Sequence, residues 1–142
     1  MVCLDTDVFI GLLKGDNEAI TLINKLQSIG EVLKTTIITA YELLKGAAIS
    51  SKPQENLKIV KDLLSNIIIL TLDYGSCEEA SEIYSKLKSK GQIIGEFDIL
   101  IAAIVKHNNE YLISRDKHFQ LIEKLNVQIW WLLVLLRKNF NW

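Results

Sequence analysis

Short apolar runs alternate along the chain with longer stretches in which apolar residues recur every three or four positions. The short runs are rich in β-branched residues and predict strands at 2–4, 32–38, 67–71, 111–114 and 127–130. The longer stretches predict helices at 8–13, 17–28, 39–50, 53–64, 76–90, 97–107 and 116–125. This alternation, with solidly apolar strands, predicts an α/β fold in which helices cover both faces of a mostly parallel sheet.

Two residues mark the ends of predicted helices. Pro53 is the only proline of the chain, and we expect it in the first turn of a helix that runs to about Leu64. Gly91 follows the predicted helix 76–90 and is a candidate for its C-terminal cap. No internal repeat or linker interrupts the pattern, so these signals describe a single domain.

Composition narrows the class of protein. The 142 residues are 49% hydrophobic, which fits one compact domain with a sizeable core. The formal net charge is −1, so a polyanionic partner has to be held by a local basic patch or through bound cations. Cys3 and Cys77 form no CxxC pair and no disulfide framework, which favours a reducing, cytoplasmic setting.

Two segments bear on membranes and export. The N-terminus lacks basic residues and contains two aspartates, so we do not expect it to be a signal peptide. The longest uncharged apolar run, at 129–136, reads IWWLLVLL. It is far shorter than the roughly 20 residues that span a bilayer, so no membrane association is expected.

Acidic residues recur where predicted strands end. Asp5 and Asp7 follow the first strand, Glu42 follows the second at a short distance, and Asp116 follows the strand 111–114. A further acidic pair, Glu96 and Asp98, starts a predicted helix. Because ligands bind at the carboxyl ends of strands in open parallel sheets, we expect these carboxylates to converge. Without a paired His or Cys cluster, such hard oxygen ligands favour Mg²⁺ or Mn²⁺ over zinc.

Each acid also has a purely local interpretation. Glu42 stands three residues after a threonine, which is the spacing of a capping box. Glu96 and Asp98 fall in the first turn of a helix, where the helix dipole favours acids, and Asp116 has the position of an N-cap. Asp5, directly after a buried strand, is poorly explained by capping alone. The coincidence of all these positions is what favours a metal site.

Four motifs in order, LDTDVFIGLLKG, TAYELLKG, GEFDILIAA and ISRDKHF, resemble the PIN-domain nucleases. Within that family the likeness is greatest to the VapC-type ribonuclease toxins of prokaryotic toxin–antitoxin pairs. The resemblance covers residues 1 to about 131 and implies a three-layer α/β/α fold. We therefore assign 1–131 to a PIN-like nuclease domain and 132–142 to an apolar C-terminal extension, beyond the point where relatives usually stop.

The resemblance implies roles for individual residues. The metal-binding and catalytic acids would be Asp5, Glu42, Asp98 and Asp116. Auxiliary positions would be Thr6, Asp7, Glu96 and Ser114. Asp7 departs from the family pattern, in which asparagine is commoner. Basic residues near the motifs, which could contact RNA phosphates, are Lys14, Lys45, Arg115 and Lys117.

The activity implied is hydrolysis of RNA phosphodiester bonds with Mg²⁺ or Mn²⁺, by the toxin of a toxin–antitoxin pair. The implied partners are an RNA substrate, a cognate antitoxin and a second copy of the chain in a homodimer. The apolar segment WWLLVLL is expected either to dock on its own domain or to form a homodimer or antitoxin contact. Of the two histidines, His118 could touch substrate, although a surface position is the simpler interpretation.

Three other functions compete with this one. PIN nucleases also process RNA in housekeeping pathways. The sequence DTDVF also fits the pattern of haloacid-dehalogenase-type phosphatases, in which the first aspartate is a nucleophile, but ISRDKHF lacks the late acidic pair of that family. A binding-only PIN domain is disfavoured because acids stand at all four positions.

Overall fold

The computed structural model describes residues 1–130. Its elements, in chain order, are β1 (Val2–Leu4), α1 (Thr6–Leu13), α2 (Asn17–Ser28), β2 (Leu33–Thr36), α3 (Ile37–Ala48), α4 (Pro53–Ser65), β3 (Ile68–Leu70), α5 (Tyr74–Ser89), α6 (Glu96–His107), β4 (Tyr111–Ser114), the 3₁₀ helix η1 (Lys117–Leu121) and β5 (Val127–Ile129). The predicted extension 132–142 lies outside the described residues. Among residues 1–130, no helix is both long and apolar enough to cross a membrane.

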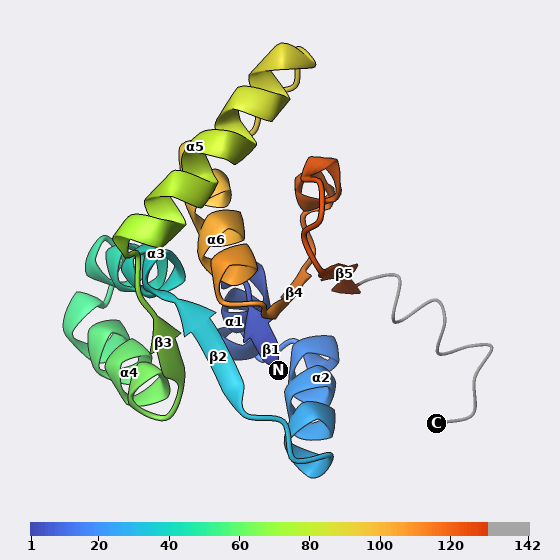
Figure 1. The fold of residues 1–142 in the computed structure, drawn as a ribbon. Coiled ribbons are helices and arrows are strands. Elements are labelled where there is room, and N and C mark those ends of the chain that lie inside the picture. Colours follow the sequence, from blue (N-terminus) through green and yellow to red (C-terminus); the bar gives the residue numbers. More distant parts are fainter. Residues whose placement is uncertain (131–142) are drawn as a thin grey trace.

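Five parallel strands form a central sheet in the order β3-β2-β1-β4-β5. In register, Val2 of β1 lies between Leu33 of β2 and Tyr111 of β4. Helices pack on both faces, with α1 to α4 against one core and α5 and α6 against the other (Figure 1). The predicted three-layer α/β/α architecture is confirmed, and the sheet is parallel throughout.

Alternating side chains divide the strands between two apolar cores. In β1, Val2 and Leu4 pack with α1 to α4, while the intervening Cys3 packs with α5 and α6. In β4, Ile113 packs with α1 to α4, and Leu112 packs with α5 and α6. Because successive side chains of a strand point to opposite faces, a run of apolar residues is buried on both sides. This explains why β1 consists of apolar residues throughout.

Three predicted elements differ in the structure. The predicted helix 116–125 is wrong, since only the short η1 forms there, with the buried Phe119 and Ile122 spaced three residues apart. Lys124 then adopts left-handed backbone with φ 59°, which prevents helix continuation. The predicted strand 32–38 ends at Thr36, where α3 begins. The predicted strand 67–71 forms only over Ile68–Leu70, at the edge of the sheet, where Ile68 is 49% exposed.

Candidate active site

The acids gather at the carboxyl ends of β1 and β4, where the strand order reverses. From β1 the chain adds β2 and β3 on one side, and later β4 and β5 on the other. Parallel α/β sheets bind ligands at such a switch point because the helices that follow adjacent strands leave a crevice there. Asp5 follows β1 directly, and Ser114 is the last residue of β4.

Asp5 is a carboxylate held almost out of water, with 6% of its surface exposed. It caps α1 by accepting a hydrogen bond from the Thr6 backbone N–H at 2.8 Å, and its other oxygen accepts one from the Ser114 hydroxyl at 2.6 Å. Burial first, and then the nearby Asp7 and Asp98, raise the pKa of Asp5 to about 7. A group so arranged holds a proton near neutral pH unless a cation compensates its charge.

Glu42 is tied to α1 by a hydrogen bond between side chains. The Thr6 hydroxyl donates to Glu42 Oε1 at 2.8 Å and also lies 3.1 Å from the Thr39 hydroxyl. The capping-box interpretation of Glu42 is wrong, because Thr36 rather than Thr39 is the N-cap of α3. The backbone N–H of Thr39 donates to the Thr36 hydroxyl at 3.2 Å, and this leaves Glu42 free to face Thr6.

Asp98 and Asp116 complete the acidic cluster from α6 and from the loop after β4. Burial raises the pKa of Asp98, and the charges of Asp116 and Glu42 raise it further, while His118 lowers it. Asp116 caps η1, accepting a hydrogen bond from the His118 N–H at 2.9 Å, so its predicted N-cap role is confirmed. The imidazole Nδ1 of His118 also lies 2.8 Å from Asp116 Oδ1. Asp98 therefore lies within electrostatic reach of Glu42 and Asp116.

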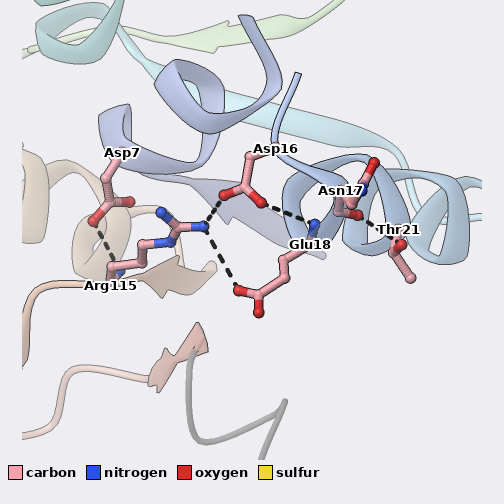
Figure 2. A network of polar contacts seen from close by, with 6 residues as sticks. All are labelled: Asp7, Asp16, Asn17, Glu18, Thr21 and Arg115. Carbon is pink, nitrogen blue, oxygen red and sulfur yellow. Dashed lines mark hydrogen bonds and ion pairs between the residues drawn. The ribbon is translucent and has the colours of Figure 1, made fainter. Parts of the chain in front are cut away.

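Asp7 links the cluster to a second polar network (Figure 2). Its Oδ2 accepts a hydrogen bond from the Arg115 backbone N–H at 2.9 Å, while its Oδ1 is buried without a hydrogen-bond partner. Burial raises the pKa of Asp7 despite the neighbouring Arg115. A buried carboxylate oxygen without a partner is energetically unfavourable, and a bound cation would relieve that cost.

The guanidinium of Arg115 points away from the acids, toward α2 (Figure 2). It lies 2.5 Å from Asp16 Oδ2 and 4.0 Å from Glu18, and it stacks 3.7 Å from the centre of the Trp130 ring. This ion pair holds the pKa of Asp16 below its usual range. Arg115 therefore links α2 to the segment after β4. From the sequence, Arg115 was predicted to contact RNA.

The remaining predicted site residues are an acid, Glu96, and three lysines, and they differ in where they lie relative to the acidic cluster. Glu96 is exposed and lines a separate hollow of about 430 Å³ beside α5, so nothing in the structure joins it to Asp5. Lys14 and Glu42 line another hollow, of about 320 Å³, between α1, α3 and α4. Lys45 lies over two aromatic rings, and Lys117 is exposed at the start of η1.

Sequence reasoning missed two contributors, Thr39 and Thr36. Both are fully buried, and their hydroxyls lie 3.4 Å apart beneath Glu42. A threonine three residues before another at a strand–helix junction is the spacing of an N-cap and its N3 residue. That signal could have moved the predicted start of α3 from Thr39 to Ile37.

The donor set suits a hard divalent cation, although the side chains do not enclose one as they stand. Within residues 1–130, no three His, Cys, Asp or Glu side chains are placed to hold a metal ion. Thr6 holds Glu42 and Ser114 holds Asp5, so each carboxylate is oriented by a hydroxyl rather than by a shared ligand. Burial raises the pKa values of Asp5 and Asp98, and Asp7 Oδ1 is buried without a hydrogen-bond partner, so a bound cation would stabilise the charged forms of these acids.

Comparison with known proteins agrees with this geometry. The PIN domain family matches residues 2–125. Ribonuclease VapC1 of Methanocaldococcus jannaschii is 30% identical over 132 residues, covering 91% of this chain and 86% of that protein. Ribonuclease VapC2 of Haemophilus influenzae is 27% identical over 128 residues, covering 89% and 96%. The structure of VapBC-1 from nontypeable Haemophilus influenzae superimposes with a TM-score of 0.82 at 28% identity, covering 92% of this chain and 98% of that one.

The match extends from β1 through the loop after β4, so it includes every element that supplies an acid to the cluster. On this basis the chain belongs to the PIN-domain family and groups within it with the VapC ribonucleases.

Proposed function

We propose that this chain is an endoribonuclease that hydrolyses RNA phosphodiester bonds with Mg²⁺ or Mn²⁺, as the toxin of a toxin–antitoxin pair. The observation that supports it most is the convergence of carboxylates at the carboxyl ends of β1 and β4, where Asp5 is 6% exposed and Asp7 Oδ1 is buried without a hydrogen-bond partner. A cluster of carboxylates at a switch point gains most from a divalent cation, since the cation removes both the repulsion and the uncompensated burial.

The proposed ligands are Asp5, Glu42, Asp98 and Asp116, all of which offer hard oxygen atoms. When bound, the cation would neutralise charge on the scissile phosphate and make the attacking water more acidic. Asp7, which has one buried oxygen without a hydrogen-bond partner and whose charge acts on Asp5, is a further acid that would support this set. Glu96 remains a prediction as an auxiliary acid, and its place beside α5 does not support that role.

The chain's own side chains orient and charge the site. The Ser114 hydroxyl donates to Asp5 and accepts from the backbone N–H of Asp116 at 3.0 Å, so one hydroxyl positions two of the acids. Thr6 positions a third, Glu42. These hydroxyls restrict the orientations of the carboxylates, and the side chains still have to move closer together to share a cation.

The partners follow from the same family membership. VapBC-1, which has the same fold, is named for two components, and we propose by analogy that a small antitoxin binds this chain. We also retain the homodimer as a proposal. Sedimentation of the purified chain, alone and co-expressed with the open reading frame next to its gene, tests both partners.

The test of the activity compares the wild-type protein with Asp98→Asn on a panel of RNA oligonucleotides. We expect the wild type to cleave with Mg²⁺ or Mn²⁺ and to lose cleavage with EDTA. Asp98→Asn should lower kcat by at least about 100-fold, because it removes a charged ligand while keeping the size of the side chain. Glu78→Gln, an exposed change on α5, serves as the matched control.

Persistent cleavage by Asp98→Asn would overturn the assignment. Turnover of p-nitrophenyl phosphate through a covalent adduct on Asp5 would instead support the phosphatase alternative. RNA binding by the wild type without any cleavage, at every divalent cation tried, would support a binding-only domain.

A further inference from the structure

Two exposed aromatic side chains meet beside the acidic cluster. Tyr41 of α3 is 51% exposed and Phe97 of α6 is 39% exposed. Their ring centres lie 5.7 Å apart, and the ring planes meet edge to face at 88°. The ammonium of Lys45 lies over both rings, 5.4 Å from the centre of Tyr41 and 5.6 Å from the centre of Phe97. We call these three residues the aromatic platform.

The aromatic platform adjoins two of the acids in sequence and in space. Tyr41 directly precedes Glu42 on α3, and Phe97 directly precedes Asp98 on α6. Consecutive helical side chains are about 100° apart around the axis, so each ring flanks its acid without sharing its direction. The contact between Tyr41 and Phe97 shows that α3 and α6 pack together at these positions.

Burial in the core does not account for these rings. Neither belongs to the two apolar clusters that hold the sheet and helices together. The edge-to-face pair and the cation above it keep the rings in place at the surface. Exposed rings with a neighbouring cation are the usual elements of single-stranded nucleic-acid sites, where bases stack and phosphates pair with the cation.

We propose that the aromatic platform binds RNA, with an unpaired base stacking on Tyr41, the more exposed ring, and meeting the perpendicular Phe97 ring at its edge, while Lys45 contacts a phosphate next to it. This inference rests on the proposed ribonuclease activity and names the substrate form, an unpaired strand rather than a duplex. In a duplex, the base faces are covered by their neighbours and are not open to a ring. The positive charge of Lys45 beside the carboxylates also favours a polyanion over an apolar protein partner.

The first experiment measures stacking directly. Single-stranded RNA oligonucleotides of about twelve nucleotides carry the fluorescent base 2-aminopurine at successive positions, with Ca²⁺ replacing Mg²⁺. We expect quenching at one or two positions on the wild-type protein and its loss with Tyr41→Ala and Phe97→Ala. Tyr41→Phe, which keeps the ring, should retain the quenching. Tyr74→Ala, on the 80% exposed Tyr74 of α5, is the matched control and should also retain it.

The second experiment separates binding from chemistry. With Mg²⁺ or Mn²⁺, we expect the Tyr41→Ala/Phe97→Ala variant to raise KM about tenfold or more, the effect expected for one lost stacking contact, with kcat little changed. Lys45→Gln should weaken RNA binding and lower the slope of log affinity against log salt by about one. Melting temperatures of all variants serve to exclude misfolding.

The outcomes distinguish this inference from the proposed function. If the wild type cleaves RNA but the double variant keeps the same KM and quenching, the platform is overturned and the ribonuclease stands. If quenching is unchanged and the double variant alters the sedimentation of the protein, the platform is a protein contact and the inference is wrong. If the wild type cleaves no RNA, the proposed function fails whatever the quenching shows.

Discussion

At the scale of single residues, hydroxyl groups control the charge of the acidic cluster. Ser114 and the Thr6 N–H both lower the pKa of Asp5, while burial and the neighbouring aspartates raise it. The balance leaves the carboxyl titrating near neutral pH, where small changes in its contacts alter its charge. Two predictions follow from this balance, one on cation affinity and one on stability.

Ser114→Ala should weaken Mn²⁺ binding about 10- to 100-fold, the range seen when a group that orients a ligand is lost. Without the hydroxyl, the pKa of Asp5 rises further, so a proton competes better with the cation. The acid limb of the cleavage profile should therefore move to higher pH. Titration calorimetry with Mn²⁺ checks the affinity. Ser89→Ala, at the exposed end of α5, is the control, and equal affinities of Ser114→Ala and wild type would contradict the prediction.

The metal-free protein should lose stability as the pH rises from about 4 to about 7. The native state binds the Asp5 proton more tightly than the unfolded state, so its contribution is complete below the usual pKa of 3.8 and disappears by about 7. The loss should be on the order of a few kcal/mol, and Asp7 and Asp98 act in the same direction. Urea unfolding in EDTA at several pH values measures it.

Asp5→Asn removes the titrating group and should flatten this pH dependence, and saturating Mg²⁺ should do the same for the wild type. A wild-type profile that rises with pH in EDTA would show that the Asp5 carboxyl is not destabilised by burial as the structure indicates.

At the scale of elements, the starts of α1, α3 and α6 place the acids, and their caps are therefore functional. Asp5 is both the N-cap of α1 and a proposed ligand, whereas α3 is capped by Thr36, six residues before Glu42. Helix α6 begins after Gly95 with no side-chain cap, and its first turn contains Glu96 and Asp98. A helix N-terminus favours negative charge, so it stabilises these acids where repulsion opposes them.

Thr36→Ala should destabilise the protein by about 1–2 kcal/mol, because the first turn of α3 loses its cap. The same change should lower activity, since Glu42 lies in the second turn and depends on the position of the helix start. Thr36→Ser keeps the capping oxygen and should recover most of both. Urea unfolding and cleavage rates measured side by side check this, and wild-type stability of Thr36→Ala would contradict it.

At the scale of the whole molecule, the carboxyl ends and the amino ends of the strands carry different charged groups. The carboxyl ends hold the acidic cluster, and the amino ends hold a buried ion pair between Lys34 of β2 and Glu110, which precedes β4. The two charged atoms lie 2.6 Å apart, and the side chains are 11% and 2% exposed. Because β1 lies between β2 and β4, this pair ties the centre of the sheet together away from the active site.

Glu110→Ala should destabilise the fold by about 3–5 kcal/mol, since it leaves the Lys34 ammonium buried without its partner. The double variant Lys34→Met/Glu110→Leu should recover most of this loss, because apolar groups need no partner. Activity below the melting temperature should be unchanged in the double variant. Chemical denaturation checks the stabilities. A double variant as unstable as Glu110→Ala would show that the pair is needed for more than mutual neutralisation.

The fold was largely predictable because strand and helix signals are local. The limits of β1, α2 and β4 agree with the predicted ranges, and the alternation of elements was enough to predict parallel pairing. The predictions that differ from the structure concern features that tertiary contacts determine. β3 lies at the edge of the sheet, a position that the strand order determines. The segment 116–125 contains only a short 3₁₀ helix before the chain returns to the sheet at β5.

The sequence by itself determined which acids follow strands and start helices, because those positions depend on neighbours within a few residues. Only the tertiary structure determined which partner each side chain faces. Glu42 faces Thr6, which is 36 residues away, and Asp5 meets Ser114, which is 109 residues away. Arg115 pairs with Asp16, which is 99 residues away. Such contacts depend on how distant segments pack, and no local pattern encodes them.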